Sequence, residues 1–350
     1  KLMLRSLVIL MASAGLLSAC HDPAGGAGGG VREQIRAVGS STVFPFTTAV
    51  AEQFVNAKPN YRSPIIESTG TGAGMKLFCS GVGAQYPDIE NASRRMKAGE
   101  YALCKKNGVD KIVEIQIGVD GLALGESKRG SRMALSVREI YLAIAANPDG
   151  KPNRARTWAD INPALPTTPI VVYGPPSTSG TRDSLTELIM TPGCDQNPVN
   201  KALKAVDEDK HKDRCTRIRE DGAYVDAGEN DNLIVQKLGA NPDAVGIFGY
   251  SFLEENLDTL AGIPIDGVEP TYDSIASFAY PGARPLYIYV KSAHLRAIPG
   301  LKEFVAEYAG AWNPGGPLAR RGLIAATPDV RAQNVAVATA LTPLDPAVLK

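Results

Sequence analysis

The chain has 350 residues, 44% of them hydrophobic, and its 37 Lys and Arg residues balance its 37 Asp and Glu residues. Zero net charge disfavours a general nucleic-acid binder, which needs a basic excess to displace counterions. The hydrophobic content excludes a disordered chain, and the length suffices for two lobes that each bury a core. With only His21, His211 and His294 present, a histidine-based catalytic or metal site has little material.

The first residues resemble an export signal. Lys1 and Arg5 precede an apolar stretch over residues 7–17, which is too short to span a membrane. We therefore expect residues 1–19 to be a signal peptide, with translation starting at Met3 or further upstream.

The apolar stretch ends in LSAC, which resembles the lipobox of bacterial lipoproteins. This resemblance implies that Cys20 becomes the lipidated first residue. Residues 20–30 continue as HDPAGGAGGG after the cysteine and would form a flexible glycine-rich tether to a membrane. The alternative is an ordinary signal peptide with a chance cysteine.

Four further cysteines suggest disulfides, because an even number is typical of exported chains. Three pairings are possible, and we favour the local one, whose loops of about 22–26 residues each give roughly 3–3.5 kcal/mol in the loop-entropy model. The favoured pairs are Cys79–Cys104 and Cys194–Cys215. A zinc site is the alternative, but no C-x-x-C spacing supports it.

After the tether, short β-branched or aromatic runs alternate with helical patterns. This alternation predicts an α/β fold with largely parallel sheets covered by helices. The predicted strands span residues 35–38, 64–67, 111–117, 170–173, 245–248 and 286–290.

Three predicted strand exits share a loop rich in Ser, Thr and Gly that leads into a helix. The loops are GSST at 39–42, STGTGAG at 68–74 and STSGTR at 177–182. The helix after the first loop has Pro45 near its start, and Phe46, Val50 and Phe54 mark its apolar face.

Such an exit suits an oxyanion. The first helical N–H groups lack backbone partners, and the helix dipole places partial positive charge there. Glycines let an anion approach the backbone, and hydroxyls add donors. One such loop is weak support, since Ser and Thr are common helix caps. Three on one α/β chain favour an anion site where the carboxyl ends of strands converge.

The sequence lacks the motifs of nucleotide-binding proteins and of serine hydrolases. The 68–74 loop has neither the dinucleotide nor the nucleotide P-loop spacing, and no Gly-x-Ser-x-Gly elbow occurs. His211 lies in the mixed-charge run DEDKHKDR and His294 follows a predicted strand, so we expect both at the surface. Trp158 and Trp312 are expected to pack in the core. We predict no catalytic residue, no metal site and no cofactor.

The loops, in this order, resemble the phosphate-binding proteins of Pst-type ABC importers over about residues 33–330. Single pieces are common, but the ordered set is specific. Besides the three loops, the matching segments are NASR at 91–94, WADINP at 158–163, LP at 165–166, NP at 241–242, VGIFGY at 245–250 and RPLY at 284–287.

The resemblance implies a type II periplasmic-binding-protein fold, in which two α/β lobes joined by two crossovers form a ligand cleft and close around the anion by a hinge. We place the crossovers near 119–122 and 280–285. Lobe 1 would comprise residues 31–119 plus 284–350, and lobe 2 residues 120–283. The implied protein is a monomeric, lipid-anchored periplasmic solute-binding protein, not an enzyme, that delivers inorganic phosphate to ABC importer permease subunits.

The phosphate-binding residues carried over from the family, with Arg182 added as the available cation, are Ser41, Thr42, Val43, Thr71, Arg94, Ser179, Gly180, Thr181 and Arg182. The alternatives are that Arg94 is a surface residue and that Arg182 pairs with Asp183 or Glu187.

Two departures from the family bear on this set. Pro175 and Pro176 stand where many members carry an arginine, and Arg94 stands where many carry an aspartate that accepts a proton from phosphate. Another carboxylate would have to replace that aspartate. The candidates are Asp88, Asp120 and Glu229.

Three other functions stay open. The site could take another tetrahedral oxyanion such as sulfate, molybdate or arsenate. An exported phosphate-ester hydrolase would need a nucleophile beside a base, or a metal cluster. A surface adhesion or scaffold role would leave the anion site vestigial.

Overall fold

The computed structural model describes residues 32–228 and 231–349. Its strands are β1 (Arg36–Gly39), β2 (Ile65–Ser68), β3 (Ile89–Ala92), β4 (Ile112–Ser127), β5 (Val172–Gly174), β6 (Tyr224–Asp226), β7 (Val245–Gly249), β8 (Leu260–Gly262) and β9 (Ala283–Lys291). Its α-helices are α1 (Phe44–Ala57), α2 (Thr71–Phe78), α3 (Ala98–Lys106), α4 (Val137–Ile144), α5 (Trp158–Ile161), α6 (Gly180–Ser184), α7 (Thr191–Asp195), α8 (Pro198–Val206), α9 (Glu208–Thr216), α10 (Asp231–Ala240), α11 (Tyr250–Glu255), α12 (Tyr272–Ala276), α13 (Leu301–Ala311) and α14 (Pro328–Ala340). A π-helical turn, η2 (Leu185–Met190), joins α6 to α7, and 3-10 turns occur at η1 (Pro148–Gly150), η3 (Ser292–Leu295), η4 (Ala319–Arg321) and η5 (Pro346–Val348).

The strands of the described chain form one sheet in the order β2-β1-β3-β9-β4-β7-β5-β6, with β8 also paired to β4. The α/β class is confirmed, but the sheet is mixed rather than largely parallel. β1 runs parallel to β2 and β3, and β5 runs parallel to β6 and β7. The long strands β4 and β9 run antiparallel to each neighbour, because β9 returns alongside β4 instead of following a right-handed crossover.

β4 connects the two halves of the sheet. Its first part, residues 112–121, pairs with β9, and its last part, residues 122–127, pairs with β7 and β8. This strand is longer than the segment 111–117 that the sequence predicted. β3, β6 and β8 were not predicted, because segments of three or four residues carry too little period-two pattern and form through pairing with their neighbours.

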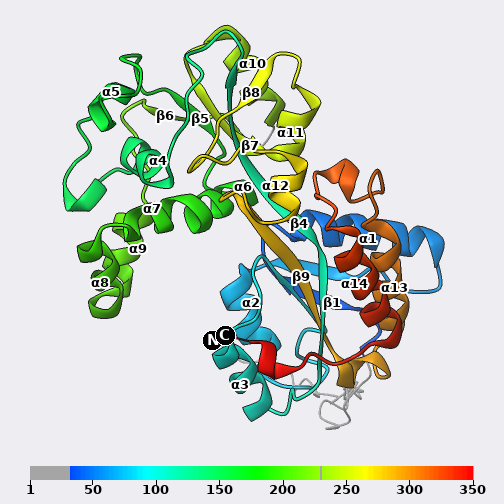
Figure 1. Cartoon of the computed structure of the whole chain (residues 1–350). Coiled ribbons are helices and arrows are strands. Elements are labelled where there is room, and N and C mark those ends of the chain that lie inside the picture. Colours follow the sequence, from blue (N-terminus) through cyan, green and yellow to red (C-terminus); the bar gives the residue numbers. More distant parts are fainter. Residues whose placement is uncertain (1–31, 229–230, 350) are drawn as a thin grey trace, which may run out of the picture. The chain divides into compact units, whose positions relative to one another are not determined.

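Helices cover both faces of the β1–β9 half of the sheet. α1 and α13 bury Phe46, Val50, Phe54 and Phe304 against one face. α2 and α3 cover the other face with a smaller core that includes Phe78. Figure 1 shows α13 and α14 on one side of β1 and β9 and α2 and α3 on the other. The predicted apolar face of the first helix is therefore confirmed.

A third core lies around β7 and the end of β4. Its members come chiefly from residues between Val119 and Tyr280, and they include Tyr141, Trp158 and Phe248. Trp158 and Trp312 are each 1% exposed, as expected of packing residues. The largest group of buried side chains thus lies in the part of the chain that follows the midpoint of β4.

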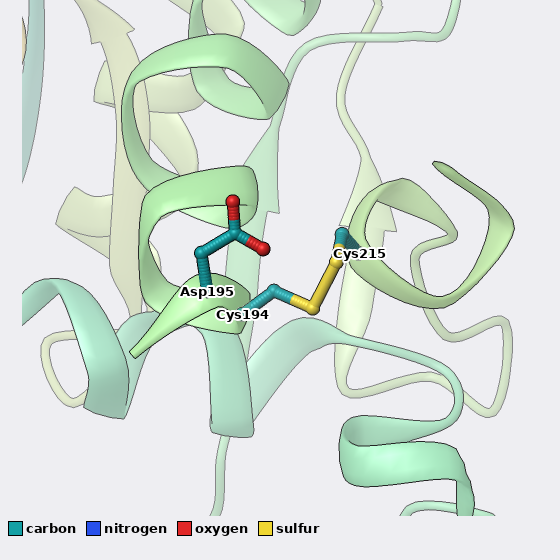
Figure 2. Close-up of side chains that lie close together, drawn as sticks. All are labelled: Cys194, Asp195 and Cys215. Carbon is teal, nitrogen blue, oxygen red and sulfur yellow. A yellow bond between two sulfur atoms is a disulfide. The ribbon is translucent and has the colours of Figure 1, made fainter. Parts of the chain in front are cut away.

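The structure forms both of the disulfides that the spacing favours. Cys79–Cys104 joins the end of α2 to α3, and Cys194–Cys215 joins α7 to α9. In the described part of the chain, the one group with metal-ligand spacing is Cys194, Asp195 and Cys215 (Figure 2). Its two sulfurs are bonded to each other, so they are not thiolates that could hold zinc.

The expectation that the histidines lie at the surface is wrong. His211 is 4% exposed and its Nε2 lies 2.7 Å from Asp195 Oδ1. The charged run around His211 forms the helix α9. Residues four apart lie on the same face of a helix, and His211 and Cys215 are the two buried residues of α9. His294 is 3% exposed, and its Nδ1 lies 2.6 Å from Asp88 Oδ1.

No described helix is both long and apolar enough to cross a membrane. The predicted signal peptide, Cys20, the tether and Glu229 lie outside the described residues.

Candidate anion-binding site

The first loop leaves the buried strand β1 and enters α1. Thr42 is 8% exposed, and its N–H donates to Ser40 Oγ at 3.2 Å. The Ser40 N–H donates in turn to the carbonyl of Asn91 on β3, which ties the loop to the sheet. The Ser41 hydroxyl donates to the carboxylate of Asp183 at the start of α6. The first loop is therefore connected to the third loop by a side chain.

The third loop enters α6 after β5. Ser179 caps the helix, since its Oγ accepts from the Thr181 N–H at 3.1 Å. Gly180 lies directly against Thr42: a Cβ on Gly180 would lie 2.8 Å from Thr42 Cα. Only glycine permits that approach. The Thr42 hydroxyl donates to the Gly180 carbonyl at 3.2 Å, although the two residues are 138 positions apart.

These two loops line one cavity of about 550 Å³. Its walls bring together side chains from segments that are distant in the sequence. The lining residues include Ser41, Thr42, Ser68, Asp120, Ser179, Gly180, Thr181 and Asp231. The first and third Ser/Thr/Gly loops thus lie together at one cavity, as predicted for converging loops. The second loop contributes Ser68 to the lining.

Thr71, the residue that the resemblance selects from the second loop, lies at the start of α2 and is 8% exposed. Its Oγ1 is 3.0 Å from Ser93 Oγ and accepts from the Ser93 N–H at 3.1 Å. It is absent from the lining of the 550 Å³ cavity. Thr71 therefore joins α2 to the turn after β3.

Arg94 lies in the same turn and lines a different cavity, of about 590 Å³, together with Arg95 and Arg284. Its guanidinium makes a two-pronged ion pair with Glu100 at 2.7 and 2.9 Å. Hydrogen bonding to Glu100 raises the pKa of Arg94. Neither this residue nor its partner lines the cavity between the first and third loops.

Arg182 is absent from the lining of the cavity between the first and third loops. Its Nη1 donates to the Pro175 carbonyl at 2.7 Å and to the Tyr224 hydroxyl at 2.8 Å, and its guanidinium lies over the Tyr224 ring at 4.8 Å. Burial raises the pKa of Tyr224 to about 12, so the phenol remains a neutral partner. Arg182 thus donates to Pro175 and Tyr224, whereas Asp183 and Glu187 bind other residues.

The cation that the structure brings to the first loop is Arg284, which the sequence analysis passed over as a site residue. It is 4% exposed at the start of β9, and its Nη2 donates to Thr42 Oγ1 at 2.8 Å and to Ser184 Oγ at 2.6 Å. Its Nε donates to Asp120 Oδ2 at 3.0 Å, and its Nη1 pairs with Glu187. The available sequence signal was an arginine just ahead of the apolar and aromatic run at 286–290.

Asp120 is the one candidate carboxylate that lines the cavity among those the structure describes. Its Oδ2 accepts from Arg284 and, at 2.6 Å, from the Ser184 hydroxyl. Asp88, in contrast, is buried beside the start of β1, where it binds Arg32, the Arg36 N–H and His294. Of the two candidate carboxylates that the structure describes, Asp120 therefore has the position to touch a ligand.

Comparison with known proteins shows which families this chain resembles. Residues 24–311 match the PBP superfamily domain. The chain is 31% identical over 277 residues to protein SphX of Synechococcus elongatus, covering 76% of this chain and 72% of the relative. It is 30% identical over 296 residues to the phosphate-binding protein PstS of Staphylococcus saprophyticus, covering 83% of this chain and 80% of the relative. A crystal structure of a possible phosphate binding protein from Planctomyces limnophilus superposes with a TM-score of 0.69 at 27% identity, over 88% of this chain and 99% of that one.

This mixed α/β chain is thus a member of the PBP superfamily. Within that superfamily, the chain belongs to the family of phosphate-binding proteins. The resemblance drawn from the loops, and the type II binding-protein fold that it implied, are confirmed.

Proposed function

We propose that this protein captures inorganic phosphate outside the cytoplasm and delivers it to the permease subunits of an ABC importer. The observation that carries the proposal is the meeting of Thr42, Gly180 and Arg284. Two hydroxyl-rich helix starts line one cavity, and the buried Arg284, which lines the 590 Å³ cavity, donates to Thr42 at its wall. A phosphate oxyanion needs several N–H and O–H donors and positive charge in one place. The similarity to phosphate-binding PstS supports the choice of anion.

The proposed ligand set keeps the donors of the first and third loops and adds Arg284. In the proposed complex, Ser41, Thr42, Ser179, Gly180 and Thr181, which line the cavity, would turn hydroxyl or backbone N–H groups to the anion. Val43 would add its backbone N–H at the start of α1. Each charge-assisted hydrogen bond would contribute roughly 1.5–3 kcal/mol. Thr71, Arg94 and Arg182 stay predicted ligands, which a closing movement would have to bring to the anion.

We propose that the ligand lies between two lobes, residues 31–119 plus 284–350 and residues 120–283, with the hinge near 119–122 and 280–285. The separate hydrophobic cores on either side of the β4 midpoint support this division. β4 would pass through the proposed crossover at 119–122, and β9 would begin within the one at 280–285. The Thr42–Gly180 and Arg284–Glu187 contacts would then join one lobe to the other.

Selectivity for phosphate would come from Asp120. A phosphate ion at neutral pH retains a proton that an ionised carboxylate can accept, whereas sulfate is fully ionised and would meet a like charge. Asp120 already accepts from Arg284 and Ser184 and lines the cavity. These two contacts would fix the position of its carboxylate at the anion.

Outside the described residues, we propose that residues 1–19 are removed and that a lipid on Cys20 anchors a monomeric protein through its glycine-rich tether. The LSAC sequence and the run HDPAGGAGGG support this. Binding is proposed to be non-covalent, with no turnover.

Calorimetric titration of the ligand-free protein with phosphate, arsenate, sulfate and molybdate tests the proposal. The expected result is phosphate binding at micromolar affinity or tighter, with sulfate weaker by roughly tenfold or more. The absence of heat with all four anions contradicts the proposal, and a sulfate or molybdate preference reassigns the ligand. Release of phosphate from a generic phosphomonoester, abolished by a chelator, would favour a hydrolase instead.

A further inference from the structure

Glu90 is a buried acid that the proposed binding site does not use. It lies on β3, between β1 and β9, and is 0% exposed. Neither carboxyl oxygen has a hydrogen-bond partner among the described residues. A buried polar group without a partner costs free energy, and a charge in that position costs much more.

The carboxyl fills the space that two glycines leave open. A Cβ on Gly39 would lie 2.7 Å from Glu90 Oε1, and a Cβ on Gly74 would lie 2.4 Å from Glu90 Oε2. Gly39 ends β1 with a φ of +126°, and Gly74 lies in the first turn of α2. The acid is therefore held between the end of β1 and the start of α2.

Both glycines belong to the loops that the sequence analysis singled out for an anion. Gly39 directly precedes Ser40 and Thr42 of the first loop, and Gly74 follows Thr71 in the second. The carboxyl thus lies against the backbone of two of the three loops. Any charge on it would act on an anion at those loops through a medium of low dielectric.

The surroundings favour the neutral acid. Charged or titratable side chains lie on every element packed around Glu90. They are Arg36 on β1, Lys76 on α2, Asp88 just before β3, Arg94 after β3, Glu100, Tyr101, Lys105 and Lys106 on α3, and Arg284, Tyr287, Tyr289 and Lys291 on β9. Arg36 pairs with Glu67, Arg94 pairs with Glu100, and Lys76 is exposed. Burial raises the pKa of Glu90 well above its usual range, and the Glu100 carboxylate adds to this while Arg94 opposes it.

We infer that Glu90 remains a neutral carboxylic acid behind the first two phosphate loops, and that its ionisation at alkaline pH weakens phosphate binding. The inference rests on the proposed function. A neutral side chain adds nothing to the charge that a phosphate dianion meets, whereas an ionised one adds a repulsion that hydroxyl donors must overcome. Glu90 would in this way determine how much negative charge the site accepts.

Titration of phosphate against the wild type, Glu90→Gln and the exposed control Glu220→Gln tests the inference across about pH 6 to pH 9. Glutamine keeps the shape of the neutral acid and does not ionise. We expect the wild type and Glu90→Gln to bind within roughly twofold of each other near pH 6. Near pH 9 the wild type should bind roughly tenfold more weakly than Glu90→Gln, because only the wild type can ionise.

The ratio of the two dissociation constants removes the titration of phosphate itself, which is common to both proteins. Glu220 is exposed, so Glu220→Gln should follow the wild type at every pH. A ratio that does not change with pH overturns the inference. Weaker binding by Glu90→Gln at all pH values also overturns it, because the acid would then be needed only as a hydrogen-bond donor or for packing.

A second measurement needs no phosphate and no variant. The titration of the Glu90 side-chain carboxyl, followed by carbon NMR in the ligand-free wild type, should have a midpoint well above that of an exposed glutamate. An ordinary midpoint contradicts the neutral acid even if phosphate binds. A raised midpoint in a protein that binds no phosphate contradicts the proposed function and the coupling of Glu90 to binding, but not the neutral state of Glu90.

Discussion

Arg284 and Thr42 lie 242 positions apart in the sequence, yet Arg284 Nη2 donates to Thr42 Oγ1 at 2.8 Å. The arginine opens β9 and the threonine ends the loop before α1. Because Arg284 also contacts Asp120, Ser184 and Glu187, it connects residues of the first loop, the β4 midpoint and the third loop's helix. The candidate site is therefore organised around one buried cation.

Replacing that cation should impair binding. We expect Arg284→Gln to weaken phosphate binding roughly 10- to 100-fold, since a charge-assisted contact is worth roughly 1.5–3 kcal/mol. Calorimetry measures the affinity, and Arg320→Gln, which removes an exposed arginine, serves as the matched control. Unchanged affinity in folded Arg284→Gln would remove this residue from the site, and a large loss in Arg182→Ala alone would assign the role to Arg182.

The contact between the first and third loops leaves no room for a methyl group. Gly180→Ala places a Cβ 2.8 Å from Thr42 Cα, so the loops must move apart. We expect phosphate binding to fall roughly tenfold or more, with a small change in thermal stability. Gly239→Ala, where a Cβ on α10 meets nothing within 4 Å, should leave binding unchanged and slightly stabilise the helix. Equal affinities in the two variants would show that the loops need not touch.

Asp120 should control the choice of anion. In Asp120→Asn, the like charge that sulfate would meet is gone, and the acceptor for the phosphate proton is weaker. We expect the preference for phosphate over sulfate to fall by roughly tenfold, with phosphate affinity itself lower. Competition titrations with both anions measure the ratio, and Asp243→Asn provides an exposed control. A preference that survives the substitution would assign selectivity elsewhere.

Lys291 should make stability depend on pH. It is 0% exposed, its Nζ donates to the Gly81 carbonyl at 2.6 Å, and burial lowers its pKa to about 7. Between that pKa and the ordinary lysine value, the unfolded chain binds more protons than the folded one, so the free energy of unfolding rises with pH.

We therefore expect the wild type to gain stability relative to Lys291→Met between about pH 7 and pH 10. Denaturant unfolding at several pH values measures the difference. The exposed residue Lys302 supplies the control, since Lys302→Met should show the same pH dependence as the wild type. If the free energies of unfolding of the wild type and Lys291→Met change with pH in the same way, the buried lysine keeps its ordinary pKa.

Local signals in the sequence predicted much of what forms locally. The Ser/Thr/Gly loops, the apolar face of α1 and the positions of six strands follow from turn chemistry and periodicity, which act over a few residues. The pairs Cys79–Cys104 and Cys194–Cys215 were likewise accessible, because their loops are short. The ordered motifs also sufficed to recognise the family.

Tertiary structure decided the rest, because burial and long-range contact do not follow from local pattern. The sequence around His211 and around His294 is typical of a surface segment, yet both side chains are buried in the folded protein. The sheet is mixed because β9 pairs antiparallel with β4. The residues of neither strand, taken alone, predict that pairing. Arg284 meets Thr42, and Glu90 lies between Gly39 and Gly74, only because β1, β3 and β9 are neighbours in the folded sheet. The sequence by itself determined which loops could hold an anion, and the packing of strands distant in the chain determined which charges surround it.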